Sequence, residues 1–203
     1  MKGLYLVTPD LDDTARLCEH TEQALLGGAA LLQYRHKMAS PAQRLEQAGA
    51  LLALCRRHGV PLIINDHVDL CLALDADGIH VGGTDLNVAT VRALVGPQKI
   101  VGASCYGSLE LAWKAAEGGA SYIALGGFYP SRVKKYPVTT PVQLITQVQR
   151  EIGLPLVVIG GMTVDNAAVL VEAGADMVAA ISSVYGAADV LHAAREFAGL
   201  FGN

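Results

Sequence analysis

The 203-residue sequence predicts an α/β fold in which eight parallel strands alternate with eight helices. Short apolar runs, typical of strands buried on both faces, alternate with longer segments whose apolar residues recur at helical spacing. Four helix-to-strand junctions carry small residues, in the stretches GGAALL, DADGIHV, GGASYIAL and AGADMVA, and these recur at every second unit. Such a repeat in a chain of this length favours a TIM (β/α)8 barrel over a doubly wound open sheet. We expect a single domain over residues 1–203.

Local signals set the expected bounds of each element. Asp12 or Asp13 starts the first helix, while Ser40 and Pro41 supply an N-cap and a first-turn proline for the second. Glycines and prolines end most elements. Strands are expected over residues 3–8, 30–35, 62–64, 78–81, 100–104, 122–126, 156–159 and 177–181. Helices are expected over residues 12–27, 40–58, 87–95, 108–118, 140–152, 163–173 and 187–200, with a short one between the third and fourth strands.

Composition narrows the class of protein. The net charge is −4 and no run of Lys or Arg exceeds two residues, which argues against a nucleic-acid or membrane partner. The apolar stretch near the N-terminus is too short for a signal peptide. Cys18, Cys55, Cys71 and Cys105 lack C-x-x-C spacing and are expected as free thiols in a reducing cytoplasm. Nothing in the pattern decides the oligomeric state, which leaves a homo-oligomer open.

In a barrel of this kind, functional residues are expected at the carboxyl ends of the strands. Asp66 follows the third strand directly, with Asn65 beside it, and Asp85 follows the fourth. Neighbouring parallel strands end on the same side, so the two carboxylates are expected within reach of one ion. Paired carboxylates suit Mg²⁺ that keeps several waters and binds through substrate phosphates. The alternative is that Asp66 only caps the helix that follows it.

Cationic side chains follow the second strand. Because strand side chains alternate, Gln33, Arg35 and Lys37 share one face, which we expect to be the barrel interior, and Tyr34 and His36 share the other. An inward amide, guanidinium and ammonium pack poorly but form a good clamp for a diphosphate. The alternative is a charged strand end that pairs with neighbouring acids.

Other strand ends carry further candidates. Ser104 ends the fifth strand and offers one hydrogen bond to a ligand. The stretch GGFYPSRVKKYP after the sixth strand is a basic active-site lid or a solvated loop. After the seventh and eighth strands, Gly160–Gly161 and Ser182–Ser183 suit a phosphate cradle or are tight turns only. Two anion sites on one rim indicate two phosphorylated substrates. His80 lies inside a strand and is expected to be a hydrogen-bonded core histidine.

These motifs together resemble those of the thiamine-phosphate synthase family, over essentially the whole chain. They are QYRHK, IND, the G-x-x-D that ends at Asp85, GAS, YPSRVKK, IGGM and ISS. The resemblance implies a TIM barrel that joins a hydroxymethylpyrimidine diphosphate to a thiazole phosphate, with release of diphosphate. It also implies a dissociative mechanism, in which diphosphate leaves first and the thiazole nitrogen attacks a pyrimidine-methyl cation.

Position by position, the resemblance implies two substrate sites and a metal site. Asp66 and Asp85 would hold Mg²⁺, and Arg35, Lys37 and Lys134 would stabilise the leaving group. The pyrimidine diphosphate would be bound by Gln33, Arg35, Lys37, Asn65, Ser104 and Lys134. The thiazole phosphate would be bound by Ser131, Val133, Gly161, Ile181 and Ser182.

The sequence departs from the family pattern at two positions. Val133 stands where the family usually has Thr, and Gly83 stands where Gln is common. Neither change removes a charged group, so we expect weaker thiazole-phosphate binding rather than lost chemistry. Two alternatives stay open: a paralogue similar to the thiazole tautomerase, against which Asp66, Asp85 and Lys37 argue, and a non-catalytic phosphate-binding or regulatory barrel.

Overall fold

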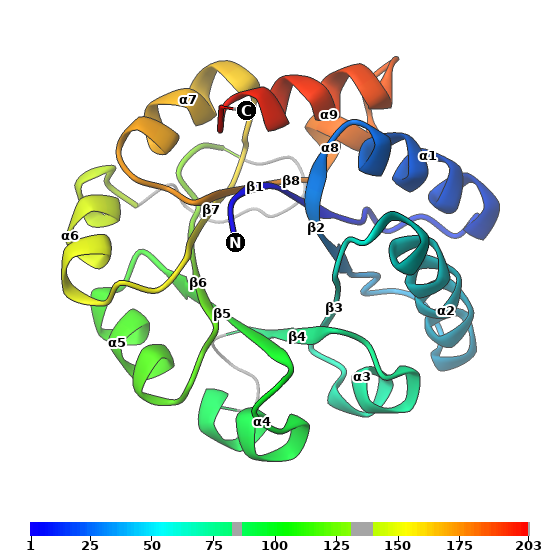
Figure 1. The fold of residues 1–203 in the computed structure, drawn as a ribbon, viewed down its shortest axis with the longest axis horizontal. Helices are drawn as coiled ribbons and strands as arrows, with labels where there is room; N and C mark the ends of the chain where they lie inside the picture. Colours follow the sequence, from blue (N-terminus) through cyan, green and yellow to red (C-terminus); the bar gives the residue numbers. More distant parts are fainter. Residues whose placement is uncertain (83–86, 131–139, 203) are drawn as a thin grey trace.

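In a computed structural model the chain forms a closed barrel of eight parallel strands in sequence order, ringed by helices (Figure 1). The structure describes residues 1–82, 87–130 and 140–202. Each strand pairs in parallel with the next, and β8 closes the barrel on β1. The predicted TIM barrel is therefore confirmed over the open sheet. The strands are β1 (Gly3–Val7), β2 (Ala29–Tyr34), β3 (Leu62–Asn65), β4 (Gly78–Val81), β5 (Ile100–Tyr106), β6 (Tyr122–Gly126), β7 (Leu156–Ile159) and β8 (Met177–Ala180).

The helices largely begin where the sequence predicts. Asp13 and Ser40 cap α1 and α2 by accepting from the backbone N–H three residues on. The helix expected from Thr140 begins only at Gln143. Thr140 precedes Pro141, and a residue before a proline disfavours helical backbone angles. The last predicted helix is preceded by a separate short one, α8, that the sequence analysis did not foresee. The helices are α1 (Thr14–Leu26), α2 (Pro41–His58), α3 (Val68–Leu74), α4 (Val88–Val95), α5 (Leu109–Glu117), α6 (Gln143–Glu151), α7 (Val164–Glu172), α8 (Ser182–Tyr185) and α9 (Val190–Gly199).

Strand alternation divides the apolar residues into two cores. On β1, Leu4 and Leu6 belong to the larger core, which packs the strands against the helices. Tyr5 and Val7 belong to a second core that fills the inside of the barrel. The other buried members of that inner core come from β2, β3, β6, β7 and β8: Leu31, Ile63, Tyr122, Ala124, Val157, Met177 and Ala179. Leu31 therefore does point into the barrel, as the interpretation of the second strand requires.

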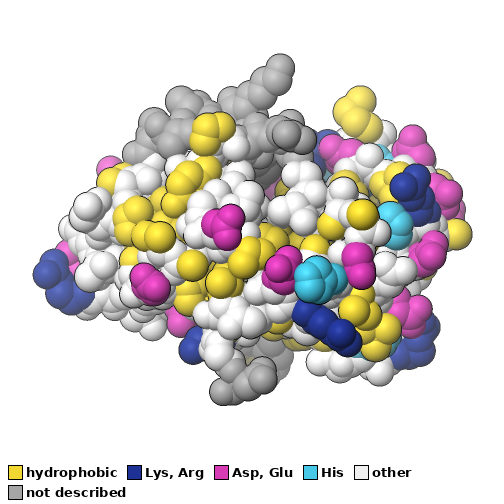
Figure 2. Space-filling model, turned by 90° about the horizontal axis from the view of Figure 1, so that it is seen from above, with side chains coloured by type: hydrophobic (Ala, Val, Ile, Leu, Met, Phe, Trp, Pro, Cys, Tyr) yellow, Lys and Arg dark blue, Asp and Glu magenta, His cyan; other side chains and the backbone are white. Residues whose placement is uncertain are grey.

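The surface toward the top of Figure 1, where α7 and α9 lie, mixes side chains of both charges with hydrophobic ones (Figure 2). Within the described ranges, no helix combines the length and the apolar character needed to cross a membrane. Cys55, Cys71 and Cys105 are buried and all four cysteines are free thiols. Burial raises the pKa of the Cys105 thiol to about 12, so this strand-end cysteine is not an activated nucleophile.

Candidate active site

Two adjoining cavities lie at the carboxyl ends of the strands. The larger, of about 340 Å³, is lined by residues that end β5 to β8. The smaller, of about 30 Å³, lies deeper inside the barrel between β1, β2 and β4 to β8. The boundary between the two cavities is formed by the residues that line both: Ser104, Ala124, Ile159, Ala179 and Ile181. The site thus combines one open cavity with a recess of roughly one water molecule's volume beside it.

The end of β2 brings one amide and one guanidinium to the smaller cavity. Gln33 and Arg35 are buried and line that cavity, as the alternation predicted. Arg35 Nη1 lies 3.4 Å from Asp10 Oδ1, and the same carboxylate accepts a 2.9 Å hydrogen bond from Lys37 N. Lys37 is exposed and lines neither cavity, contrary to the inward position predicted for it, because β2 ends at Tyr34 and the alternation of a strand does not extend past its end. The Arg35 guanidinium therefore lines the cavity and forms an ion pair with Asp10. Asp10 orients this guanidinium, a role that the sequence analysis did not indicate.

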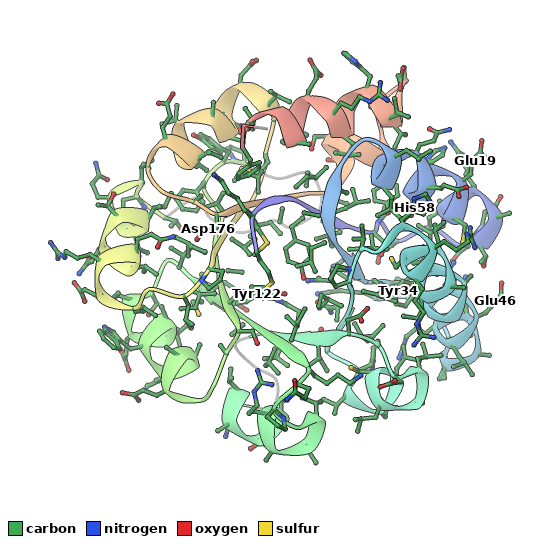
Figure 3. The ribbon with its side chains drawn as sticks, viewed as in Figure 1. Glu19, Tyr34, Glu46, His58, Tyr122 and Asp176 are labelled. Atoms are coloured by element: carbon green, nitrogen blue, oxygen red, sulfur yellow. The ribbon has the colours of Figure 1, made fainter. Side chains whose placement is uncertain are left out.

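The other face of this segment is fixed to α2. Tyr34 OH donates to Gln47 Oε1 over 3.0 Å, and His36 Nδ1 lies 3.2 Å from the same oxygen. Figure 3 shows Tyr34 on the side of α2, outside the ring of strands. Thr8 Oγ1 holds the backbone of Arg35 through bonds of 3.0 and 2.8 Å to its carbonyl and N–H. Hydrogen bonds to Thr8 on one side and to α2 on the other therefore fix the backbone and the outward side chains of residues 34–36.

The carboxyl ends of β3 and β4 are neighbours, as predicted for the metal-binding acids. Asn65 Nδ2 donates to Asp66 Oδ2 over 2.6 Å, and Asp66 has a left-handed φ of 62°. The N-cap position of the helix that follows is His67, whose side chain makes no capping hydrogen bond, so the alternative that Asp66 is its N-cap is wrong. Asp85 lies outside the described residues, and no group of three or more metal-ligating side chains occurs among the described ones. The half-buried Asp66 carboxylate is a hard oxygen ligand that fits Mg²⁺, and its pairing with Asp85 stays a prediction.

The predicted phosphate cradle comes together at the larger cavity. Gly161, Ile181 and Ser182 all line it. Gly161 has a φ of 63°, and a Cβ atom there would lie 2.3 Å from the carbonyl oxygen of Pro130. Ser182 opens α8, and the first N–H groups of a helix have no acceptor within it. Ser131, Val133 and Lys134 lie outside the described residues, directly after Pro130, which also lines the cavity.

The structure adds aromatic residues that sequence reasoning did not single out. Tyr106 and Tyr129 line the larger cavity, and Tyr106 is held at a left-handed φ of 52°. Tyr129 OH donates to the carbonyl of Asn166 over 3.2 Å, which ties the loop after β6 to α7. His80, predicted to be a hydrogen-bonded core histidine, is indeed partnered: Nδ1 lies 2.9 Å from Tyr122 OH and Nε2 lies 2.8 Å from Ser104 Oγ.

Comparison with known proteins decides the family of this barrel. The family model described as thiamine monophosphate synthase matches residues 4–184. The chain belongs to the thiamine monophosphate synthase family. A thiamine-phosphate synthase of Janthinobacterium sp. (strain Marseille) is 63% identical over 201 residues, which is 99% of this chain and 97% of that protein. One from Methylobacillus flagellatus is 52% identical, with 99% and 96% covered.

A solved structure extends the family assignment to three dimensions. The thiamine phosphate pyrophosphorylase from Pyrococcus furiosus superposes with a TM-score of 0.85 at 32% identity, covering 98% of this chain and 94% of that one. The resemblance inferred from the strand-end motifs is confirmed by these matches.

Proposed function

We propose that this protein is a thiamine-phosphate synthase, a transferase of thiamine biosynthesis. It condenses a hydroxymethylpyrimidine diphosphate with a thiazole phosphate to give thiamine phosphate and diphosphate. The observation that carries this proposal is the 63% identity to a thiamine-phosphate synthase across 99% of the chain. The two adjoining cavities at the strand ends support it, because Gln33 and Arg35 of the pyrimidine set line only the smaller one, Gly161 and Ser182 of the thiazole set line only the larger one, and Ser104 and Ile181 line both. We also propose that residues 1–203 act as one catalytic domain, in the cytoplasm.

The residues at the smaller cavity are suited to hold the pyrimidine diphosphate. Arg35 is oriented by Asp10, and its guanidinium matches phosphate oxygens bidentately. Lys37 and Lys134 would add point charges as the leaving diphosphate gains negative charge. Mg²⁺, held by Asp66 and Asp85 with Asn65 beside them, would supply further neutralisation of the diphosphate.

The residues at the larger cavity are suited to hold the thiazole phosphate against the reacting carbon. The bare backbone at Gly161 lets a phosphate approach closely, and Ser182 adds a hydroxyl, with Ile181 packing beside it. Ser131 and Val133 would complete this end. The reaction is dissociative, so no general base is needed; the two substrates must only be held in line.

The decisive experiment is direct detection of thiamine phosphate from the two substrates, with and without Mg²⁺. We expect metal-dependent product, and Asp85→Ala should abolish turnover while the far-UV circular dichroism stays unchanged. Undiminished turnover of that variant would disprove the metal assignment.

Lys134→Ala should lose roughly 10²-fold or more in rate, as for other groups that stabilise developing charge. Val133→Thr should lower KM for the thiazole phosphate. An unchanged or raised KM would contradict the prediction that valine at this position weakens binding of that substrate.

The same assay separates the alternatives. A tautomerase-like paralogue would convert the thiazole without consuming pyrimidine diphosphate, and a regulatory barrel would bind phosphates without turnover. Both are disfavoured because the charged residues of the synthase motifs are all present in the sequence.

A further inference from the structure

A chain of five hydrogen-bonded polar side chains, here called the relay, runs through the barrel interior, and all but the half-buried Ser104 are buried. Gln33 Nε2 donates to Tyr5 OH over 2.7 Å, and Tyr5 OH lies 2.6 Å from Tyr122 OH. Tyr122 OH lies 2.9 Å from His80 Nδ1, and His80 Nε2 lies 2.8 Å from Ser104 Oγ. Figure 3 shows Tyr122, the middle member, inside the ring of strands. Both ends of this relay line the smaller cavity.

The space that the Tyr122 and His80 rings occupy exists because a glycine stands between them on β5. The register places His80 opposite Gly102 and Gly102 opposite Tyr122, in one layer across β4, β5 and β6. A Cβ atom at Gly102 would lie 1.9 Å from Tyr122 Cζ, so only glycine leaves room for this ring. The vacant space lets His80 and Tyr122 stack at an interplanar angle of 21°, with ring centroids 5.7 Å apart. Tyr5 meets the same ring edge-on, at 87°.

The relay has a direction. The amide of Gln33 presents its nitrogen to Tyr5, so the oxygen of Tyr5 is an acceptor and its proton is free for Tyr122. In the order that follows, Tyr122 OH donates a hydrogen bond to His80 Nδ1, and the imidazole is the neutral tautomer protonated at Nε2. That N–H donates to Ser104 Oγ, whose own proton is left for the cavity. Burial raises the pKa of Tyr5 and of Tyr122, so both stay protonated phenols.

We propose that this relay fixes a hydrogen-bond acceptor, Gln33 Oε1, and a donor, Ser104 Oγ–H, on the wall of one cavity. A 4-aminopyrimidine is complementary to that pair, because its exocyclic N–H donates and the adjacent ring nitrogen accepts. A 4-oxopyrimidine presents the reverse pattern, and accommodating it without losing a hydrogen bond of the relay requires every member of the relay to reverse together. Tyr5, Tyr122 and His80 are thus positioning residues that select the amino over the oxo ring. This inference rests on the proposed function for the identity of the ring.

The test compares Tyr122→Phe with Tyr34→Phe. Each removes one buried phenol hydroxyl, but Tyr34 bonds to Gln47 on the outer face of β2, away from both cavities. Calorimetry gives the dissociation constants of the 4-amino and 4-oxo forms of the pyrimidine monophosphate, which need no turnover. We expect wild type and Tyr34→Phe to prefer the amino form strongly, and Tyr122→Phe to lose roughly tenfold or more of that preference. Tyr5→Phe should behave like Tyr122→Phe, while KM for the thiazole phosphate stays unchanged in both.

The wild-type protein supplies a second readout that does not depend on any variant folding. Long-range ¹H–¹⁵N correlation on histidine-labelled protein should show His80 as the neutral Nε2–H tautomer, assigned by loss of its signals in His80→Gln. An Nδ1–H tautomer would overturn the assigned direction. Unchanged discrimination in Tyr122→Phe, with wild-type turnover intact, would overturn the relay and leave the proposed function standing. Failure of the wild type to bind either pyrimidine or to make product would overturn both.

Discussion

Gly161→Ala provides a sharp test of the phosphate cradle. The φ of 63° costs a non-glycine residue about 1–2 kcal/mol. The added methyl would also lie 2.3 Å from Pro130 O, whereas ordinary contacts begin near 3.4 Å, so the two backbone segments must separate by about 1 Å. Such overpacking typically costs a further ~1–3 kcal/mol. The shift falls where Gly161 and Pro130 line the larger cavity, so binding of the thiazole phosphate should weaken at least tenfold.

Gly153→Ala is the matched control. Gly153 has a φ of 69°, and a Cβ atom there would have no atom within 4 Å. This variant should therefore show the conformational cost alone, with normal KM values for both substrates. Each kcal/mol lost should lower Tm by roughly 2–4 °C in a protein of this size, so differential scanning calorimetry separates the two variants. Equal Tm and equal thiazole-phosphate KM in the two variants would refute the reasoning.

Three further predictions concern other parts of the barrel. Arg92→Lys should lower the free energy of unfolding by about 2 kcal/mol in urea titrations, because its planar guanidinium donates to three backbone carbonyls and one serine hydroxyl. Asp10→Asn should raise KM for the pyrimidine diphosphate several-fold and leave that for the thiazole phosphate unchanged, because Arg35 loses its partner. Burial raises the pKa of Cys55 and Cys105 to about 12, so the folded state keeps protons that the unfolded thiols lose near pH 9. Unfolding free energy should therefore be unaffected by these thiols below about pH 9 and fall as pH rises toward 12.

Each of these predictions has its own control. Arg150→Lys, at an exposed arginine, should leave stability unchanged, and an equal loss there would show that the Arg92 network is not the cause. Asp165→Asn, on α7, should leave both KM values unchanged, and a rise matching that of Asp10→Asn would contradict the role given to the ion pair. A Cys55→Ala, Cys105→Ala double variant should show a flatter alkaline decline than wild type, and an identical slope would exclude the thiols as its source.

Much of the fold and part of the site follow from local sequence patterns. The alternation of buried strands and amphipathic helices requires two layers, and parallel strands joined by helices all end on the same rim. The period of two in a strand places Gln33 and Arg35 inward and Tyr34 outward, and the structure has them so. Pro141 is a local signal that was missed, since the residue before a proline disfavours helix and α6 starts later than expected.

What the sequence by itself determined was the barrel, its family and the rim on which the chemistry lies, because each depends on periodicity and on short motifs. Only the tertiary structure decided which side chains meet across the barrel. Tyr5 and Tyr122 are 117 residues apart, and their contact depends on strand register and on the space left at Gly102. The pairing of Asp10 with Arg35 likewise depends on how β1 and β2 are staggered. Barrel closure couples the registers of all eight strands, so no local segment carries that information.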